Sequence, residues 1–131
     1  MSDAVEVVRE LSARFQAGDR EGAFALFHPD IRIVQPASLP HGGTHVGHDG
    51  VMAMGTRFAE HWDRTITDPG IAAYGDHGDG VVQVTTQTWT SKATGRSATV
   101  DVVELLTVVD GLVTEIRVFP QDTSSLGATL A

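Results

Sequence analysis

The chain has 131 residues, the length of one domain and enough to bury a core without disulfides. It contains no cysteine, which excludes disulfides, thiolate catalysis and cysteine-based zinc or iron–sulfur sites. Seventeen acidic residues against nine basic ones give a net charge of −8, so nucleic acids and anionic membrane surfaces are poor partners. No apolar stretch is long enough to span a bilayer and no signal-peptide pattern is present, so we expect a cytoplasmic protein.

Helical periodicity dominates the first part of the chain. Apolar residues recur every three or four positions over residues 4–15, and Gly18 ends this pattern. Asp19 is a typical cap for a second, short helix. Residues 31–35 then predict a strand, which Pro36 ends.

A loop rich in glycine, proline and histidine is expected over residues 37–49. Asp49 is a typical cap for a third helix, expected over residues 50–62. Strand-like runs then cover residues 71–74, 81–90, 97–109 and 112–119. We expect a turn at residues 76–80, a hairpin turn at Asp110-Gly111 and a loose tail after Ser124.

The order of these elements predicts an α+β fold, because helices come first and strands last. We expect three N-terminal helices packed on a strongly curved, mostly antiparallel sheet. Such a sheet forms a cone, and its open end would be a single apolar pocket. The chain is expected to be one domain over residues 1–131, with an ordered core over about 4–126 and a tail over 127–131.

Three polar residues interrupt otherwise apolar strands and mark a candidate site. Gln35 ends the first strand, Glu104 lies within residues 100–106, and Asp122 follows the last strand. A buried carboxylate costs free energy unless it is paired, hydrogen-bonded or protonated, and folds accept that cost mainly at functional sites. The three residues therefore predict a pocket that several strands line.

Each of the two acids has two interpretations. Asp122 is in phase with Ile116 and Val118, which predicts a carboxylate facing the pocket, but aspartate is also common at caps and turns. Glu104 is either a pocket acid with a raised pKa or a carboxylate paired to Arg117. Gln35 either orients a carbonyl, hydroxyl or water, or is a satisfied amide at a strand end.

Three histidines, His41, His45 and His48, fall within eight positions. No His-Glu-x-x-His element occurs and these residues lie on a glycine-rich loop, so neither a metal site nor a cofactor is expected. His41 or His45 is instead the candidate for a general acid or base near neutral pH. In a cone fold the core residues also form the pocket wall. The residues expected to contact substrate are Ile33, Met54, Phe58, Trp62, Trp89 and Val118.

Three stretches resemble the SnoaL-like branch of the nuclear-transport-factor-2-like superfamily. They are residues 18–24 with 26–33, residues 39–51, and residues 110–119 with Asp122. That superfamily contains polyketide cyclases, ketosteroid isomerases and limonene-epoxide hydrolases, so the resemblance implies the cone fold. It implies less about the reaction, because the fold hosts many activities and several non-enzymes.

The resemblance also places individual residues. Gln35 falls where ketosteroid isomerases have their catalytic aspartate, and Leu11 where they have an oxyanion-hole tyrosine. Glu104 matches their second, protonated acid. Only this one of the three catalytic groups of ketosteroid isomerases is kept, so their usual reaction is not expected. Asp122 falls near the acid/base aspartate of cyclases and epoxide hydrolases. The outer sheet face of the superfamily is often a dimer contact, which implies a homodimer through Val103 and Leu105.

The sequence therefore favours a cofactor-independent lyase, isomerase or cyclase. Its substrate would be a small apolar molecule that carries a carbonyl group. Two alternatives remain open: a non-catalytic protein that binds a hydrophobic ligand, and an epoxide hydrolase-like activity. A pure dimerisation module is a third, and it would have a filled pocket.

Overall fold

The computed structural model describes residues 3–67, 70–74 and 79–131. Within these residues seven strands form one sheet in the order β2-β1-β7-β6-β5-β3, and β4 also pairs with β5. The helices are α1 (Asp3–Gln16), α2 (Arg20–Phe24), α3 (Gly47–His61) and α4 (Thr123–Ala128). The strands are β1 (Phe27–Gln35), β2 (Gly43–Val46), β3 (Trp62–Ile66), β4 (Gly70–Tyr74), β5 (Gly80–Ser91), β6 (Ser97–Val109) and β7 (Leu112–Pro120).

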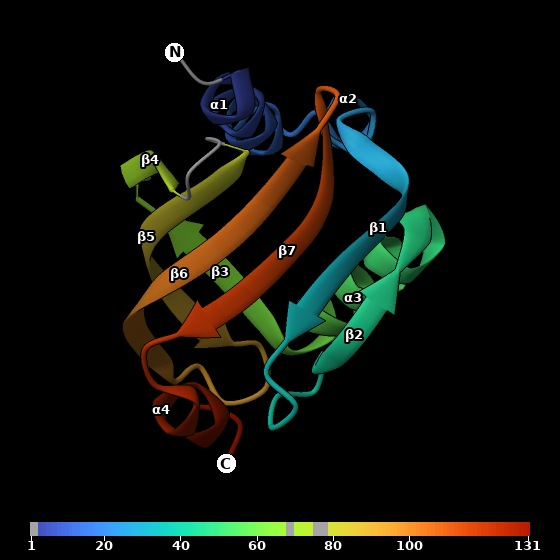
Figure 1. Ribbon diagram of the computed structural model, residues 1–131. Coiled ribbons are helices and arrows are strands. Elements are labelled where there is room, and N and C mark those ends of the chain that lie inside the picture. Colours follow the sequence, from blue (N-terminus) through green and yellow to red (C-terminus); the bar gives the residue numbers. More distant parts are fainter. Residues whose placement is uncertain (1–2, 68–69, 75–78) are drawn as a thin grey trace.

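The sheet is strongly curled, and the helices cover its ends and its concave side (Figure 1). All strand pairs are antiparallel except β1 with β7, which is parallel. In Figure 1, α1 and α2 lie at one end of the sheet, α4 lies at the other, and α3 lies behind β1 and β2. The predicted α+β cone is therefore confirmed.

Two apolar clusters fill the inside of the cone. The larger one packs α1 on the sheet and includes Val8 and Ile31, both fully buried. The smaller one lies near α4 and includes Leu39, Trp62 and Leu126. Together they leave a space between the sheet, α1 and α3, which the candidate site occupies.

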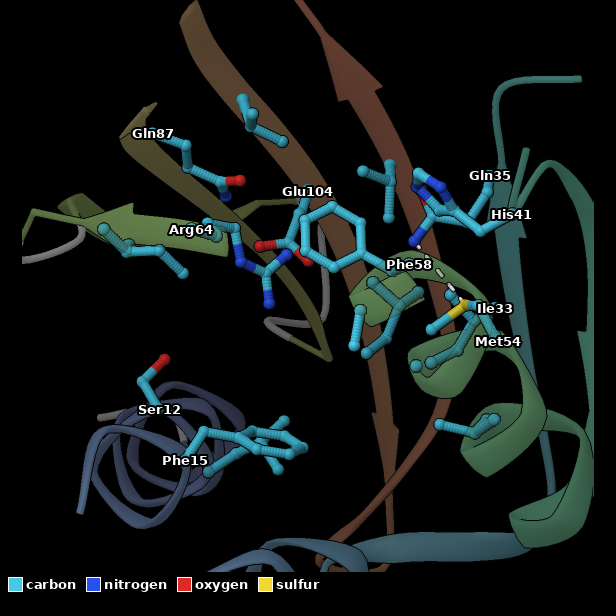
Figure 2. Close-up of a pocket in the computed structure, with 18 of the residues that line it drawn as sticks. Ser12, Phe15, Ile33, Gln35, His41, Met54, Phe58, Arg64, Gln87 and Glu104 are labelled. Atoms are coloured by element: carbon cyan, nitrogen blue, oxygen red, sulfur yellow. Dashed lines mark hydrogen bonds between the residues drawn. The ribbon is translucent and has the colours of Figure 1, made fainter. Parts of the chain in front are cut away.

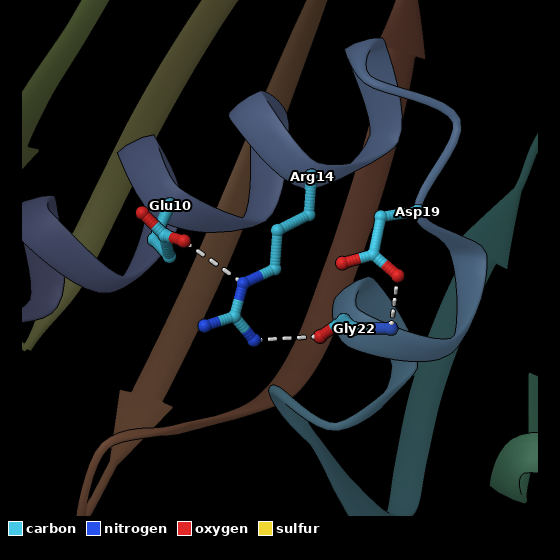
Figure 3. A network of polar contacts seen from close by, with 4 residues as sticks. All are labelled: Glu10, Arg14, Asp19 and Gly22. Carbon is cyan, nitrogen blue, oxygen red and sulfur yellow. Dashed lines mark hydrogen bonds and ion pairs between the residues drawn. The ribbon is translucent and has the colours of Figure 1, made fainter.

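A polar network fixes α2 against α1 (Figure 3). The predicted cap is confirmed, because the Asp19 carboxylate accepts a hydrogen bond of 2.9 Å from the Gly22 backbone N–H. Arg14 connects the two helices: its Nε lies 2.9 Å from Glu10 Oε1, and its Nη1 donates to the Gly22 carbonyl at 2.7 Å. This clamp holds the start of β1 beside the end of α1.

The first half of the chain holds more strand than its sequence predicts. β1 begins at Phe27, before the expected start at residue 31, and its pairing register with β7 shifts between Phe27 and Arg32. β2 lies inside the predicted loop, where residues 43–46 pair with β1. α3 begins at Gly47, so Asp49 is in its first turn rather than at its cap.

Two further segments differ from the prediction. β3 continues directly from α3 and pairs with β5, whereas the sequence predicted no strand there. The predicted loose tail is wrong, because residues after Asp122 form α4 and place Leu126 and Thr129 in the interior. The predicted turn at residues 76–80 lies largely outside the described residues.

The outer face of the sheet is partly apolar. Val84 and Phe119 are exposed there, and Val103 and Leu105 are half-buried. The homodimer expected through this face stays a prediction. No helix in the described part of the chain is long and apolar enough to cross a membrane.

Candidate active site

A cavity of about 980 Å³ lies between the concave face of the sheet, α1 and α3 (Figure 2). Its volume is at the upper end of the range of small-molecule sites in proteins. Apolar side chains form much of its wall, among them Leu11, Phe27, Ile116 and Val118. A limited set of polar groups from four strands and α1 faces the same space, and these groups decide what chemistry is available.

Glu104 is the acid of this cavity. It lies on β6 directly opposite Gln83 of β5, whose Nε2 donates a hydrogen bond of 2.9 Å to Glu104 Oε1. Gln83 in turn accepts a hydrogen bond of 2.8 Å from the Ser12 hydroxyl on α1. The chain Ser12–Gln83–Glu104 therefore fixes the carboxyl group from two elements. The alternative pairing with Arg117 is wrong, because Arg117 pairs with Leu105 on the opposite face of the sheet.

Burial sets the protonation of Glu104. Desolvation raises the pKa of its carboxyl group above the ordinary range, while the hydrogen bond from Gln83 and the charge of Arg64 oppose this rise. The position of Glu104 in the cavity wall and the raised pKa agree with the expectation, while its catalytic role stays a prediction. A carboxyl group with a raised pKa can both give and take a proton closer to neutral pH than an exposed glutamate.

Gln35 lies on the same row of the sheet as Glu104. Val34 pairs with Arg117, so by this register Gln35 aligns with Val118, which pairs with Glu104. Two strand spacings separate the backbones of Gln35 and Glu104, or about 10 Å. The Gln35 Nε2 donates to Met54 Sδ at 3.6 Å, a weak contact that leaves the amide able to orient a bound carbonyl.

His41 lies in an aromatic box in the wall of the cavity. Its ring centroid is 5.1 Å from that of Phe58, 5.9 Å from Trp62 and 5.7 Å from Trp89. A tight turn positions it, because a Cβ on Gly42 would lie 2.3 Å from the Pro36 carbonyl oxygen. Its Nδ1 is buried and has no hydrogen-bond partner among the described residues.

The predicted role of His41 as an acid or base near neutral pH is wrong. Burial, followed by the positive charge of Arg64, lowers the pKa of His41 to about 4. The imidazole is therefore neutral near pH 7 and does not titrate there. As a neutral ring it can still donate or accept a hydrogen bond to a ligand.

β5 supplies a row of polar side chains that sequence reasoning missed. Gln83, Thr85, Gln87 and Trp89 alternate along its inner face, and all line the cavity. The Trp89 Nε1 donates to Gln87 Oε1 at 2.8 Å, and the Gln87 Nε2 donates to Thr85 Oγ1 at 2.9 Å. The signal was present, because all three polar residues are in phase with Trp89 on a predicted strand.

Arg64 was also missed, because β3 was not predicted as a strand. It lies opposite Trp89, and its Cζ is 4.6 Å from the centroid of the Phe58 ring. Burial lowers the pKa of its guanidinium group, and the charge of Glu104 raises it. Arg64 and Glu104 thus bring one cation and one acid into the same cavity, where their charges affect each other's pKa (Figure 2).

Comparison with known proteins identifies the family. A family model for the SnoaL-like domain matches residues 8–116. The chain belongs to the SnoaL-like domain family. Among proteins of curated function, none matches this sequence significantly.

Solved structures agree with this SnoaL-like assignment. An NTF2-like protein from Burkholderia xenovorans LB400 is 29% identical to this chain, with a TM-score of 0.85. The match covers 98% of this chain and 96% of that protein. An NTF2-like protein of unknown function from Burkholderia pseudomallei K96243 is 27% identical, with a TM-score of 0.87. The match covers 100% of this chain and 99% of that protein. TerC, co-crystallised with polyporic acid, is 27% identical with a TM-score of 0.81, covering 98% of each chain.

Most predicted substrate contacts of this SnoaL-like domain line the cavity. The residues confirmed as part of its wall are Ile33, Met54, Phe58, Trp89 and Val118. Trp62 is the exception: it is 1% exposed and lies outside the lining, where its Nε1 donates to Thr129 Oγ1 at 2.8 Å. It belongs to the aromatic box around His41 but does not line the cavity.

Two predicted catalytic residues lie outside the cavity wall. Asp122 is exposed and caps α4, because β7 ends at Pro120 and the strand alternation that predicted an inward carboxylate ends with it. His45 contacts the His41 backbone carbonyl through its Nε2 at 2.8 Å. His45 therefore stabilises the loop that holds His41. Neither Asp122 nor His45 faces the candidate site.

No group of three or more histidine, aspartate or glutamate side chains in the described ranges is placed to hold a metal ion. The polar groups of the SnoaL-like cavity are instead the carboxyl groups of Glu60 and Glu104, the guanidinium groups of Arg20 and Arg64, amides, hydroxyls and one neutral imidazole. These groups can hold, orient and protonate an organic ligand.

The cap at Asp122 leads to a testable expectation. Asp122→Ala removes the acceptor for the Ser125 N–H, which lies 3.3 Å from Asp122 Oδ1. We expect the free energy of unfolding to fall by about 1 kcal/mol, the usual cost of a lost helix cap, with ligand binding and activity unchanged. Urea unfolding and activity measured on one preparation check both parts. A loss of activity without a loss of stability would restore Asp122 as a catalytic candidate.

Proposed function

We propose that the protein is a cofactor-independent lyase, isomerase or cyclase that moves a proton on a small, largely apolar, carbonyl-bearing metabolite. One observation carries this proposal: Glu104 is a carboxyl group inside the cavity, with burial raising its pKa and with its position fixed by Gln83. An acid with these properties is what general acid–base catalysis near neutral pH requires.

The surrounding residues define the proposed roles. Glu104 as the carboxylate takes a proton from the carbon next to the substrate carbonyl and becomes the carboxylic acid. It then returns that proton to a different carbon in an isomerisation, or to a leaving hydroxyl in a dehydration. Gln35 donates a hydrogen bond to the substrate carbonyl from the same row of the sheet, and the wall formed by Trp89 and Val118 excludes water.

The relatives support an organic ligand but leave the reaction open. TerC was crystallised with polyporic acid, which favours a small organic molecule in this family. Two structures described as candidate polyketide cyclases, from Pseudomonas putida KT2440 and a Silicibacter species, are 16% and 19% identical and share the fold. Cyclisation of a polyketide is one of the reactions that a single acid/base group and an oriented carbonyl can catalyse.

Replacement of Glu104 tests the proposal. In D2O the protein should accelerate hydrogen–deuterium exchange at the carbon next to the carbonyl in flat cyclic ketones such as 2-tetralone, followed by mass spectrometry. Glu104→Gln keeps the shape and the contact with Gln83 but cannot take a proton, so the rate should fall about a hundredfold or more.

Asp101→Asn is the matched control. Asp101 lies on the same strand but is exposed on the outer face, where it accepts a hydrogen bond from the Thr86 hydroxyl. The Asp101→Asn variant should catalyse hydrogen–deuterium exchange at the same rate as the wild type. Exchange that survives in Glu104→Gln would contradict the role of Glu104.

A binding protein without catalysis is the second candidate. One observation favours it: Ser12, Gln83 and Glu104 are already hydrogen-bonded to one another, as are Thr85, Gln87 and Trp89 in a second set. Polar groups that satisfy one another make fewer demands on a ligand. Tight ligand binding without any catalysed exchange in the wild type would favour this function.

A further inference from the structure

Arg64 is a cation inside the cavity without a close counter-ion. No carboxylate of the described residues lies within 4.0 Å of its guanidinium nitrogens, whereas the ion pairs found in those residues all lie on the outside. The other charged residues that line the cavity are Arg20, Glu60 and Glu104. Arg64 thus lines the site with a charged hydrogen-bond donor that has no ion-pair partner among the described residues.

Arg64 lies beside aromatic side chains at the wall of the cavity. Its guanidinium group lies over the Phe58 ring, and Trp89 is its neighbour across the strand pair. Burial lowers the pKa of Arg64, although the residue remains partly exposed to solvent in the open cavity. The charge of Glu104 acts on the guanidinium group but lies beyond ion-pair distance. An anionic ligand would supply the close counter-charge that the described residues do not.

The shape of the site indicates what such an anion would look like. Arginine presents its N–H groups in a flat fork. This fork can donate to the two oxygens of a carboxylate, or to an ionised hydroxyl and an adjacent oxygen atom. The fork lies against the aromatic wall of Phe58 and Trp89, which favours a flat conjugated ring next to the charged group. This combination is unusual in a protein with a net charge of −8, whose overall field repels anions.

We propose that Arg64 binds an ionised oxygen group, a carboxylate or an acidic hydroxyl, on a flat conjugated substrate of this cavity. Arg64 then defines the substrate class for the reaction proposed above, on which this assignment rests. Glu104 acts on the carbonyl part of the molecule while Arg64 holds its charged end. The preferred substrate is therefore a carbonyl compound that is also an organic acid.

Paired probes test the proposal by calorimetry on the full chain at pH 8.5. The first pair is 2-naphthoate and its neutral analogue 2-naphthamide, and the second is 4-nitrophenolate and 4-nitroanisole. The wild type should bind at least one anion about tenfold more tightly than its neutral analogue, as expected for a hydrogen bond to a charged group. Tighter binding of the anion in the first pair identifies a carboxylate as the preferred group. Tighter binding of the anion in the second pair identifies an ionised hydroxyl.

Three variants separate the charge from other effects. Arg64→Met keeps the length and the packing on Phe58, and should reduce the preference for the anion to within about twofold. Arg64→Lys keeps the charge and should retain most of the preference, which also covers the case in which Arg64→Met folds poorly. Arg96→Met removes one positive charge from an exposed position outside the cavity and should change nothing.

Several outcomes would overturn the proposal. They are equal binding of anions and neutral analogues, a preference that survives in Arg64→Met, an equal loss in Arg96→Met, and no binding of any probe by the wild type. The test is independent of the catalytic proposal, because these probes do not react. An Arg64-dependent preference without proton exchange would overturn the catalysis alone, and exchange without the preference would overturn the anion site alone.

Discussion

Leu126→Ala is expected to lower the free energy of unfolding by about 2–5 kcal/mol, the usual cost of truncating a fully buried leucine. Leu126 is 0% exposed although it lies near the end of the chain. It packs in the cluster that contains Trp62, and Thr129 one turn later accepts a hydrogen bond from the Trp62 ring. Urea unfolding of the two proteins at pH 7 measures the difference.

Ser124→Ala is the control, because Ser124 is an exposed residue of the same short helix. Its free energy of unfolding should change by no more than about 0.5 kcal/mol. If Leu126→Ala were equally neutral, α4 would not be part of the core. The Thr94 hydroxyl, which donates to the Thr129 carbonyl at 2.6 Å, would then be a surface contact rather than an anchor.

The stability of the protein should also depend on pH through His41. The pKa of His41 is lowered from 6.5 to about 4 in the folded state, by burial first and by Arg64 second. Between these values the unfolded chain binds a proton that the folded protein does not, so stability rises with pH across this window. It is fully present above about pH 6.5 and is lost progressively toward pH 4. A shift of about 2.5 pKa units corresponds to about 3 kcal/mol.

His41→Leu isolates this contribution. Leucine has no titrating group and fits an aromatic box, so the difference in unfolding free energy between wild type and variant should vary with pH by about 3 kcal/mol. The comparison cancels Glu104, whose raised pKa acts in the opposite direction over the same range. A constant difference from pH 4 to 7 would show that His41 titrates normally in the folded protein.

The pattern of the sequence was enough to find the fold and the acid. Glu104 stands out because an ionisable residue within an apolar strand is costly anywhere except at a site, and the strand 97–109 was predicted with the bounds that the structure gives. Gln35 was found in the same way. Five of the six predicted wall residues line the cavity, since in a cone the inner face of each strand is both core and wall.

Asp122 shows where this reasoning fails. Period-two alternation applies only while the chain remains a strand, and β7 ends at Pro120, two residues before the carboxylate. The sequence carried both interpretations, a pocket acid and a cap, and local pattern could not choose between them. The choice depended on Leu126 and Thr129 finding a buried place beside Trp62, which is a contact between distant parts of the chain.

The sequence by itself determined which residues are apolar, where strands alternate and which acid interrupts them, because these are local properties of the chain. Only the tertiary structure decided that Arg64 faces the same cavity as Glu104 and that burial makes His41 a neutral ring. Both depend on β3 pairing with β5 and on the loop before β2 folding into the aromatic box. The pKa of each group follows from desolvation and neighbouring charge, and these are set by residues far away in the sequence.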